Sequence, residues 1–494
     1  MRSASAPASP STLARSTIRA CGVRIPPWRS RCSAGRRRCR SVKGYPEPPS
    51  GSGCGSGTGG ALVAEAVPEE AAAAAAAITT WEPGLGAIVR QLEITPPGAS
   101  AGALAGLALG VKDLIAVAGT PRECGAPGLV DPAPQAAHAT VVTRLLAAGL
   151  TVVATTATHQ FAYGVVTPQT RNPRAPGHIA GGSSGGSAAA LAAGICDVGL
   201  GTDTGGSVRI PAACCGVVGL KTTFSSIPLD GIQPLSASLD TVGPLARSVA
   251  TCAAAYEAMS GRAAGPAGED GDDRPRVGVI RELASVGIDP EVRAAYQTAL
   301  ADLEADGARL IDVALPLLPQ ANGAAGRVLA AEALAVHAER LAAFPPEGAG
   351  RPLWQPDVLE RFARGRQLDG ATVASARGAG ERWRVVLREV FTRVDVLLAP
   401  TLPCTIPRVG VDPVTVEGRP QPVVGALTRL TNPWNLAGVP AGSVPVGTDD
   451  GGAPIGMQVI GAWDDEPRVL EVMAALERLR GGPLPAVDPG AARE

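Results

Sequence analysis

Short apolar runs alternate along the chain with longer segments in which apolar positions have helical spacing. Strand-like runs lie at Leu107–Val111, Thr151–Thr155, Val198–Gly201, Arg276–Ile280, Arg309–Val313, Val394–Ala399 and Pro454–Ile460. Helical patterns lie between them, at Ala139–Ala148, Pro290–Ala305, Ala371–Phe391 and Glu466–Leu479. Alternation of strands and helices is typical of layered proteins in which helices cover a sheet. The pattern therefore predicts an α/β fold with helices on both faces of one sheet.

The composition supports one large domain. The chain has 494 residues, of which 45% are hydrophobic but only 3% are aromatic, so its core is expected to consist mostly of Ala, Val and Leu. A chain of this length can bury a substantial core. We expect one domain over residues 76–482, followed by a short C-terminal tail over residues 483–494.

The N-terminal segment differs from the rest in charge. Residues 1–60 contain eleven basic residues, ten of them Arg, and one acidic residue, Glu47. Such Arg-, Ser- and Gly-rich sequence is typical of disorder, and we predict a disordered tail over residues 1–75. A mis-annotated start or a targeting segment is the alternative. The chain after residue 60 has 33 basic and 44 acidic residues, a net charge of −11, and offers no basic face to nucleic acid.

Two glycine-rich turns carry the candidate chemistry. They read GGSSGG at 181–186 and TDTGGS at 202–207, and they contribute Ser183 and Ser207. Flanking glycines let the backbone approach a ligand closely and aim its N–H groups at a developing oxyanion. A serine among such donors is typical of an acyl-transfer enzyme, provided that a base takes its proton.

Lys112, at the end of the apolar run LAGLALGVK, is the candidate base. Only three of the 44 basic residues are lysines, Lys43, Lys112 and Lys221. Because Arg supplies positive charge almost everywhere else, a lysine kept here indicates a need for an amine that can lose its proton. Burial at the end of an apolar strand would lower the pKa of this amine from about 10.4 toward neutrality, where a general base works best.

Simpler interpretations exist for each of these residues. GGSSGG alone is typical of a linker, but the helix-length SAAALAAGI and the strand-like DVGLG follow it, which places it inside core elements. A surface lysine paired with Asp113 is the simpler interpretation of Lys112. Cys214 or Cys215 is the alternative nucleophile, although neither has a base nearby in the sequence. A phosphate-binding loop does not fit, because no Lys-Ser or Lys-Thr follows the glycines at the required position.

Over roughly residues 80–480 the chain resembles the amidase signature family. The segments GVKD, GGSSGGSAAALAAG and GLGTDTGGSVRIPAACCGVVGLKTT match the core of that family in order and spacing, and PIGMQVIG closes the match. The resemblance implies a mixed sheet of about eleven strands covered by helices on both faces.

The resemblance also implies the catalytic residues. In the family a Ser–cis-Ser–Lys triad acts, which here makes Ser207 the nucleophile, Ser183 the bridging serine after a cis peptide bond, and Lys112 the base. The implied oxyanion hole consists of the backbone N–H groups of Thr204, Gly205, Gly206 and Ser207.

The implied function is an amidase, a hydrolase that cleaves linear amides through a serine acyl-enzyme and releases ammonia or an amine. One alternative is the glutamine-hydrolysing A subunit of a tRNA-dependent amidotransferase, although SLDTVGP has Thr241 where A subunits typically carry glutamine. A catalytically silent family member is the other alternative, although every triad position is kept. Gln160 stands where glutamate is usual, which leaves the shape of the substrate pocket open.

No metal or cofactor is expected. The four histidines, His138, His159, His178 and His337, lack a ligand spacing such as HExxH and are expected to be structural or surface residues. Ten cysteines in so long a chain fit small buried side chains in a reducing cytoplasm. We therefore expect a cytoplasmic enzyme with a small-molecule amide substrate and neither a nucleic-acid nor a membrane partner. Whether it forms a homodimer is left open.

Overall fold

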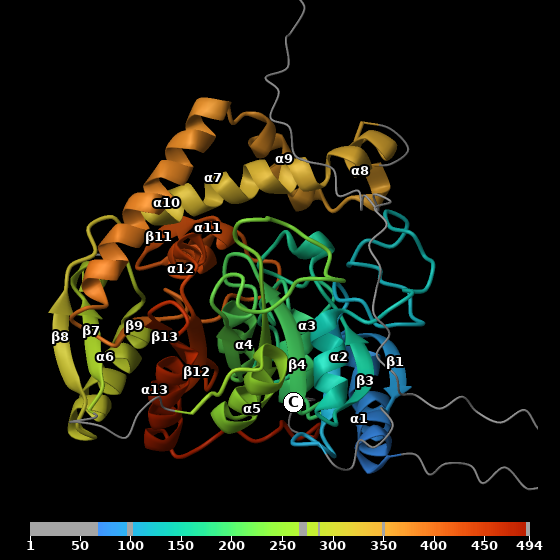
Figure 1. The fold of residues 1–494 in the computed structure, drawn as a ribbon, viewed down its shortest axis with the longest axis horizontal. Coiled ribbons are helices and arrows are strands. Elements are labelled where there is room, and N and C mark those ends of the chain that lie inside the picture. Colours follow the sequence, from blue (N-terminus) through green and yellow to red (C-terminus); the bar gives the residue numbers. More distant parts are fainter. Residues whose placement is uncertain (1–67, 96–101, 266–273, 285–286, 348–350, 491–494) are drawn as a thin grey trace, which may run out of the picture. The chain divides into compact units, whose positions relative to one another are not determined.

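The computed structural model describes residues 68–95, 102–265, 274–284, 287–347 and 351–490, so most of the predicted tail over 1–75 lies outside the described residues. An eleven-stranded sheet runs through the described part (Figure 1). In order across the sheet its strands are β1 (Ile88–Ile94), β3 (Thr151–Thr156), β2 (Ala108–Lys112), β4 (Val198–Asp203), β6 (Thr241–Ala246), β5 (Val218–Lys221), β12 (Ala441–Thr448), β13 (Pro454–Gly461), β9 (Val396–Pro400), β7 (Arg276–Ile280) and β8 (Arg309–Val313). A separate pair joins β10 (Val414–Val416) to β11 (Arg419–Gln421).

The sheet is mixed. Strand β2 pairs in parallel with β3 and β4, and β7 pairs in parallel with β8 and β9. The central strands β4, β6, β5, β12, β13 and β9 are joined by antiparallel pairs. The mixed sheet of about eleven strands is therefore confirmed.

Helices cover both faces, as predicted. They are α1 (Glu69–Leu85), α2 (Thr140–Ala147), α3 (Gly185–Ala192), α4 (Arg209–Cys215), α5 (Val249–Ser260), α6 (Pro290–Ala305), α7 (Leu318–Val336), α8 (Ala338–Ala343), α9 (Pro356–Arg366), α10 (Gly370–Val390), α11 (Val423–Thr428), α12 (Asn432–Ala437) and α13 (Glu466–Leu479). The alternation of side chains along a strand separates the faces. In β6, Val242 and Ala246 belong to the hydrophobic cluster that includes residues of α2, α5, α6 and α13, whereas Leu245 belongs to the cluster that includes residues of α1, α3 and α4.

Most predicted elements are confirmed with small shifts. The strands at 276–280 and 309–313 and the helices at 290–305 and 466–479 have the predicted bounds, and the other predicted elements differ by at most two residues at either end. Strand β6 was not predicted, because Gly243 and Pro244 weaken a strand pattern. Helix starts follow local chemistry: Pro356 begins α9, and the Asp369 carboxylate accepts from Thr372 N at the start of α10.

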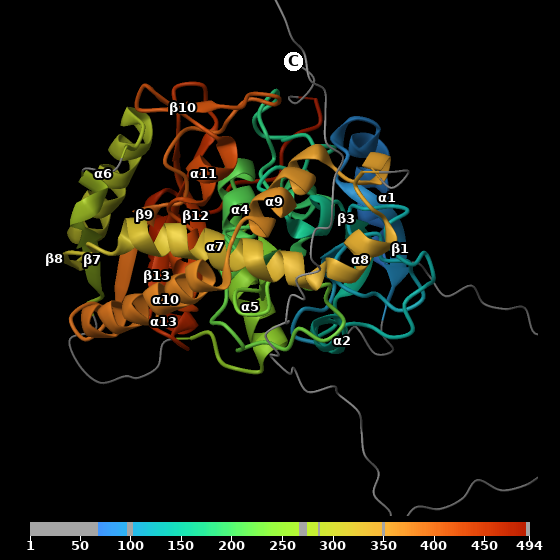
Figure 2. The same cartoon turned by 90° about the horizontal axis from the view of Figure 1, so that it is seen from above.

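Helices α7, α9 and α10 form a layer across one end of the sheet. Figure 1 shows α7 and α9 above the strands, and Figure 2 shows α7 crossing over them. Residues of α7 and α9 line one cavity together with Ser207, which follows β4. This helical layer therefore covers the end of the sheet at which β4 ends.

Helix α1 begins before the expected domain boundary at residue 76. Ala71 and Ala74 are buried, and Glu70 Oε1 accepts a hydrogen bond from Thr151 Oγ1 at 2.9 Å. In the expected C-terminal tail, Val487 N donates to Ala192 O at 2.8 Å. We propose that the folded domain begins near residue 68.

Within the described residues, no helix combines the length and apolar character needed to cross a membrane.

The position of this boundary predicts the effect of truncation. We expect a chain that begins at Ala76 to have a free energy of unfolding about 2–3 kcal/mol below that of a chain that begins at Glu69. The shorter chain lacks the hydrogen bond to Thr151 and two buried alanines. Urea unfolding followed by circular dichroism measures the difference. Equal stability of the two truncated chains would contradict a structural role for the first turns of α1.

Candidate active site

The site lies where β2 and β4 end next to each other. These strands are parallel neighbours, with Val111 opposite Leu200, so their carboxyl ends meet at the same edge of the sheet. Lys112 is the last residue of β2, and the second glycine-rich turn follows β4 directly. Parallel pairing therefore brings the predicted base close to the predicted nucleophile loop.

Lys112 is fully buried and contacts three hydroxyl groups. Its Nζ donates at 2.8 Å to Ser183 Oγ, Ser184 Oγ and Thr202 Oγ1. Burial lowers the pKa of Lys112 from 10.5 to about 7. An amine with this pKa is partly neutral at pH 7 and can accept a proton.

The simpler interpretation of Lys112 as a surface lysine paired with Asp113 is wrong. Lys112 is inaccessible to solvent, and its hydrogen-bond partners among the described residues are the three hydroxyls. The Asp113 carboxylate instead accepts from Glu123 N, at 3.1 and 3.2 Å. The buried amine is thus solvated by hydroxyl groups, and no carboxylate of the described residues contacts it.

Ser183 and Ser184 immediately precede α3. The Gly182–Ser183 peptide bond is cis, which confirms the cis bond that the family resemblance implied. A Cβ at Gly182 would lie 2.7 Å from Val166 N, so this position accepts only glycine. Ser184 N donates to Ser207 O at 3.2 Å and joins the two glycine-rich turns.

Ser207 lies at a cavity of about 210 Å³. Only 6% of the residue is exposed, and its hydroxyl forms no hydrogen bond with another described residue. The contact expected between Ser183 and Ser207 is therefore absent as a direct hydrogen bond in the described part of the chain. The hydroxyl of Ser207, the candidate nucleophile, can therefore contact a ligand in the cavity.

The expected oxyanion hole is open at three of its four positions. The N–H groups of Thr204, Gly205 and Ser207 donate to no other described atom. Gly206 differs from the expectation, because its N–H donates to Asp203 Oδ1 at 2.7 Å. The φ angle of Gly206 is +123°, a backbone conformation that favours glycine. With this conformation the turn leaves the N–H groups of Thr204, Gly205 and Ser207 unbonded within the described residues.

A fully buried ion pair holds the nucleophile loop. Arg209 Nη2 and Nε donate to Asp203 Oδ1 and Oδ2, both at 3.0 Å. The same carboxylate accepts from Gly206 N, Val208 N and Asn435 Nδ2. Burial alone would raise the pKa of Asp203, but Arg209 holds it well below its usual range. Because these hydrogen bonds satisfy the buried charge, the loop has a rigid support.

A second buried carboxylate, which sequence analysis missed, supports the loop from another side. Asp240 Oδ1 accepts from Thr204 Oγ1 at 2.6 Å, and its Oδ2 accepts from Leu235 N and Ser236 N. Glu332 of α7 accepts in turn from Ser236 Oγ at 2.7 Å. Asp240 lies in the SLDTVGP segment, which can be recognised in the sequence. Its contact with Thr204 could not be foreseen, because it depends on the pairing of β4 with β6.

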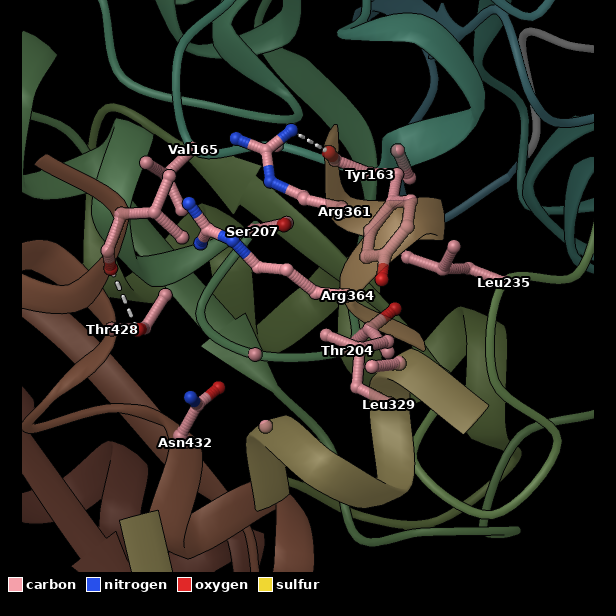
Figure 3. Close-up of a pocket in the computed structure, with 16 residues that line it drawn as sticks. Tyr163, Val165, Thr204, Ser207, Leu235, Leu329, Arg361, Arg364, Thr428 and Asn432 are labelled. Atoms are coloured by element: carbon pink, nitrogen blue, oxygen red, sulfur yellow. Dashed lines mark hydrogen bonds between the residues drawn. The ribbon is translucent and has the colours of Figure 1, made fainter. Parts of the chain in front are cut away.

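The cavity at Ser207 is built from segments far apart in the sequence (Figure 3). Helix α7 contributes Leu329, α9 contributes Arg361 and Arg364, and the segment after β3 contributes Tyr163. Sequence analysis identified none of these residues as facing the substrate, because they lie outside the glycine-rich turns and no local signal marks them.

The alternative nucleophiles are unsuited to the role. Cys214 and Cys215 are fully buried, and burial raises the pKa of Cys215 to about 12 and that of Cys214 well above its ordinary value. Thiols held in the neutral form are poor nucleophiles. The second buried lysine, Lys221, also has its pKa lowered to about 7 by burial, but its Nζ donates to Thr222 O rather than to a serine.

The histidines have structural contacts. His138 Nδ1 accepts from Ala118 N at 3.1 Å, and His159 Nδ1 lies 2.5 Å from Val166 O. His337 is buried, and this burial lowers its pKa to about 3. Within the described ranges, no group of three or more His, Cys, Asp or Glu residues could hold a metal ion.

Comparison with known proteins agrees with this geometry. Residues 76–470 match the family model described as Amidase. The chain is 36% identical over 427 residues to the A subunit of the Glutamyl-tRNA(Gln) amidotransferase of Synechococcus sp. (strain CC9605), over 78% of this chain and 85% of that protein.

Solved structures are similar over most of their length. One is a crystal structure of an amidase, with a TM-score of 0.73 and 34% identity over 83% of this chain and 95% of that chain. Another is 6-aminohexanoate cyclic dimer hydrolase complexed with substrate, with a TM-score of 0.70 and 27% identity over 84% of this chain and 94% of that chain. The chain therefore belongs to the amidase signature family.

Proposed function

We propose that the protein hydrolyses a carboxylic amide through a serine acyl-enzyme formed on Ser207. The observation that carries this proposal is Lys112, buried with a pKa of about 7 and hydrogen-bonded to Ser183 next to a cavity that contains Ser207. An amide is a poor electrophile, so its hydrolysis needs an activated nucleophile, a stabilised oxyanion and a proton for the departing amine. The site has groups for each of these tasks.

Lys112 acts as the base through Ser183. In the charged form Lys112 donates to all three hydroxyls. A neutral amine has two N–H donors and one lone pair, so neutral Lys112 can still donate to Ser184 and Thr202 while its lone pair accepts from the Ser183 hydroxyl. In the proposed relay Lys112 takes the proton of Ser183 while Ser183 takes that of Ser207, and this step requires the two serine hydroxyls, which form no direct hydrogen bond among the described residues, to come within hydrogen-bond distance when substrate binds. Ser207 Oγ bonds to the carbonyl carbon, and the same path returns the proton to the amide nitrogen as the C–N bond breaks.

Water completes the reaction. It attacks the carbonyl carbon of the ester on Ser207 and gives its proton to the same relay, which returns it to Ser207 Oγ as the carboxylic acid leaves. In both tetrahedral intermediates the oxyanion accepts from the open N–H groups of Thr204, Gly205 and Ser207. Removal of one such donor costs about 3–4 kcal/mol of transition-state stabilisation in comparable enzymes.

Glutamine hydrolysis as the A subunit of an amidotransferase is the second candidate function. The relationship to the A subunit of the Synechococcus sp. (strain CC9605) amidotransferase favours it. Thr241 argues against it, since A subunits typically carry glutamine there. In this chain Thr241 Oγ1 donates to Asp203 O at 2.8 Å, so the position is occupied by a residue that supports the nucleophile loop.

Replacement of Ser207 tests the nucleophile. We expect Ser207→Ala to lower kcat/KM for amides by at least about 10³-fold, because the other hydroxyl on the oxyanion loop, that of Thr204, is hydrogen-bonded to Asp240. Mass spectrometry after incubation with an activated ester should find an acyl group on Ser207 in the natural chain and none in the variant. Ser260→Ala, at the end of α5, serves as the control that keeps activity. An acyl group on another residue would refute the assignment.

The pKa of Lys112 predicts the pH dependence. Because Lys112 must be neutral to accept a proton, kcat/KM for an amide should fall about ten-fold per pH unit below about pH 7 and level off above it. Lys112→Ala should abolish most amide hydrolysis and remove the fall of kcat/KM below pH 7. The loss of kcat/KM in this variant should be smaller for an activated ester, because the leaving group of an ester needs less proton donation than an amine. Rates measured from pH 5 to 9 give both results. Near-normal amide turnover by Lys112→Ala would show that the base lies elsewhere.

A substrate panel separates the two candidate functions. We expect the purified chain alone to have a higher kcat/KM for its preferred aliphatic or aryl amide, one that lacks an α-amino group, than for glutamine. Ammonia release from matched panels of aliphatic, aryl and amino-acid amides gives the ranking. If glutamine ranks above every other amide, or is hydrolysed only after B and C subunits are added, the second candidate replaces the first.

A further inference from the structure

We propose that the substrate is an amide whose acyl part carries an anionic group, such as a carboxylate, and that Arg364 binds this group. The inference rests on the proposed function and extends it to the class of substrate. It derives from the charges at the cavity, from the contacts of its two arginines and from the packing of α9.

The cavity has cationic side chains in an otherwise neutral lining. Among the described residues that line it, Arg361 and Arg364 are the charged ones, and no carboxylate joins them. Apolar residues such as Val165, Leu235 and Leu329 form much of the remaining wall. Such a lining suits a ligand with a short apolar body and a negatively charged end.

Arg361 is already engaged by the protein. Its Nη1 donates to Asp357 Oδ2 at 2.8 Å and to the Tyr163 carbonyl oxygen, and its guanidinium lies 5.7 Å from the centre of the Tyr163 ring. Only 14% of its side chain is exposed. The charge of Arg361 is thus balanced by Asp357, and this arginine forms part of the wall.

Arg364 is available by contrast. Its side chain is 64% exposed, and its ion pair with Glu360, at 2.6 Å, lies on an equally exposed part of α9. Exposed pairs one helical turn apart contribute only a few tenths of a kcal/mol. A carboxylate inside the cavity can therefore replace Glu360 as the partner at little cost. Figure 3 shows the Arg364 side chain extending from α9 among the residues around Ser207.

The backbone that carries Arg364 is held firmly. Phe362 is 1% exposed and its ring lies 5.3 Å from that of Tyr163 and 5.7 Å from that of Trp354. A Cβ at Gly365 would lie 2.8 Å from Ala330 O, so α9 and α7 approach closely beside Arg364. A charged group on a fixed helix gives a more specific site than one on a loop.

Gln160 also fixes the start of α9. Its Nε2 donates to Leu353 O and its Oε1 accepts from Gln355 N, both at 2.9 Å. The glutamine that departs from the family pattern therefore holds the segment that leads into α9. Since a carboxylate and a guanidinium form strong charge-assisted hydrogen bonds, this placement selects anionic acyl groups over neutral ones of the same shape.

Binding to the inactive Ser207→Ala chain tests the inference without catalysis. The probes are glutaramate, which has a carboxylate at one end and the amide at the other, and 5-methylhexanamide, in which two methyl groups replace the carboxylate oxygens. We expect calorimetry to find glutaramate bound at least about ten-fold more tightly than the neutral amide. Equal affinities, or tighter binding of the neutral amide, would overturn the inference.

Matched variants locate the effect. In the same inactive chain, Arg364→Gln should weaken glutaramate binding about ten-fold or more and leave the neutral amide unchanged, and Arg364→Lys should retain part of the preference. Arg366→Gln removes an arginine from the same helix that does not line the cavity, and should change neither affinity. Glu360→Gln should leave glutaramate binding equal or slightly tighter, because it removes the competing carboxylate. An unchanged preference in Arg364→Gln would refute the role of Arg364.

Turnover by the natural chain separates this inference from the proposed function. If amides are hydrolysed but glutaramate and 5-methylhexanamide have equal kcat/KM and equal affinity, the inference is wrong and the proposed function stands. If glutaramate binds in an Arg364-dependent way but no amide is hydrolysed, the anion site stands and the proposed function is wrong. If both hold, kcat/KM for glutaramate should exceed that for 5-methylhexanamide by a factor similar to the ratio of affinities.

Discussion

Lys112 is buried with no contacting carboxylate among the residues that the structure describes, and this burial is the constraint on which the site depends. An ammonium group inside a protein is costly unless it is paired or loses its proton, and here the lowered pKa allows it to lose that proton. Three hydroxyls replace its water molecules. Two of these hydroxyls belong to Ser183 and Ser184, which directly follow Gly182. At Gly182 the backbone of Val166 lies so close that no residue larger than glycine fits. The glycine-rich turn is thus required by the solvation of one amine.

The buried Asp203–Arg209 pair links this site to the rest of the sheet. The free-energy cost of removing two charges from water is offset only where both charged groups form all their hydrogen bonds. Arg209 Nη1 donates to Thr431 O and to Gln458 Oε1, at 3.2 and 3.0 Å. Gln458 belongs to β13, and Asn435, which contacts Asp203, belongs to α12. The C-terminal half of the chain therefore takes part in holding a loop that the N-terminal half contributes.

Under the proposed function, different layers of the structure carry out the chemistry and select the substrate. The proposed base, serines and oxyanion donors lie at the end of the sheet, whereas the wall that faces them comes from the segment after β3 and from α7, α9, α11 and α12. A family can keep such a sheet and exchange its covering helices, so similarity of fold supports the reaction more strongly than the substrate. The contact of Glu332 in α7 with Ser236 joins the two layers, because Ser236 N also donates to the carboxylate that holds Thr204.

The sequence by itself determined the α/β class, the bounds of long periodic elements such as α6 and α13, and the candidates Lys112, Ser183 and Ser207. Periodicity, glycine-rich turns and the rarity of lysine are local signals, and they can be read without knowing which segments meet. Only the tertiary structure decided that Gly206 N–H is used by Asp203, that Asp240 supports Thr204 from 36 residues away, and that Arg364 faces Ser207. These contacts depend on strand pairing and helix packing between distant segments, and hydrophobic periodicity specifies which face of an element is buried but not its neighbour.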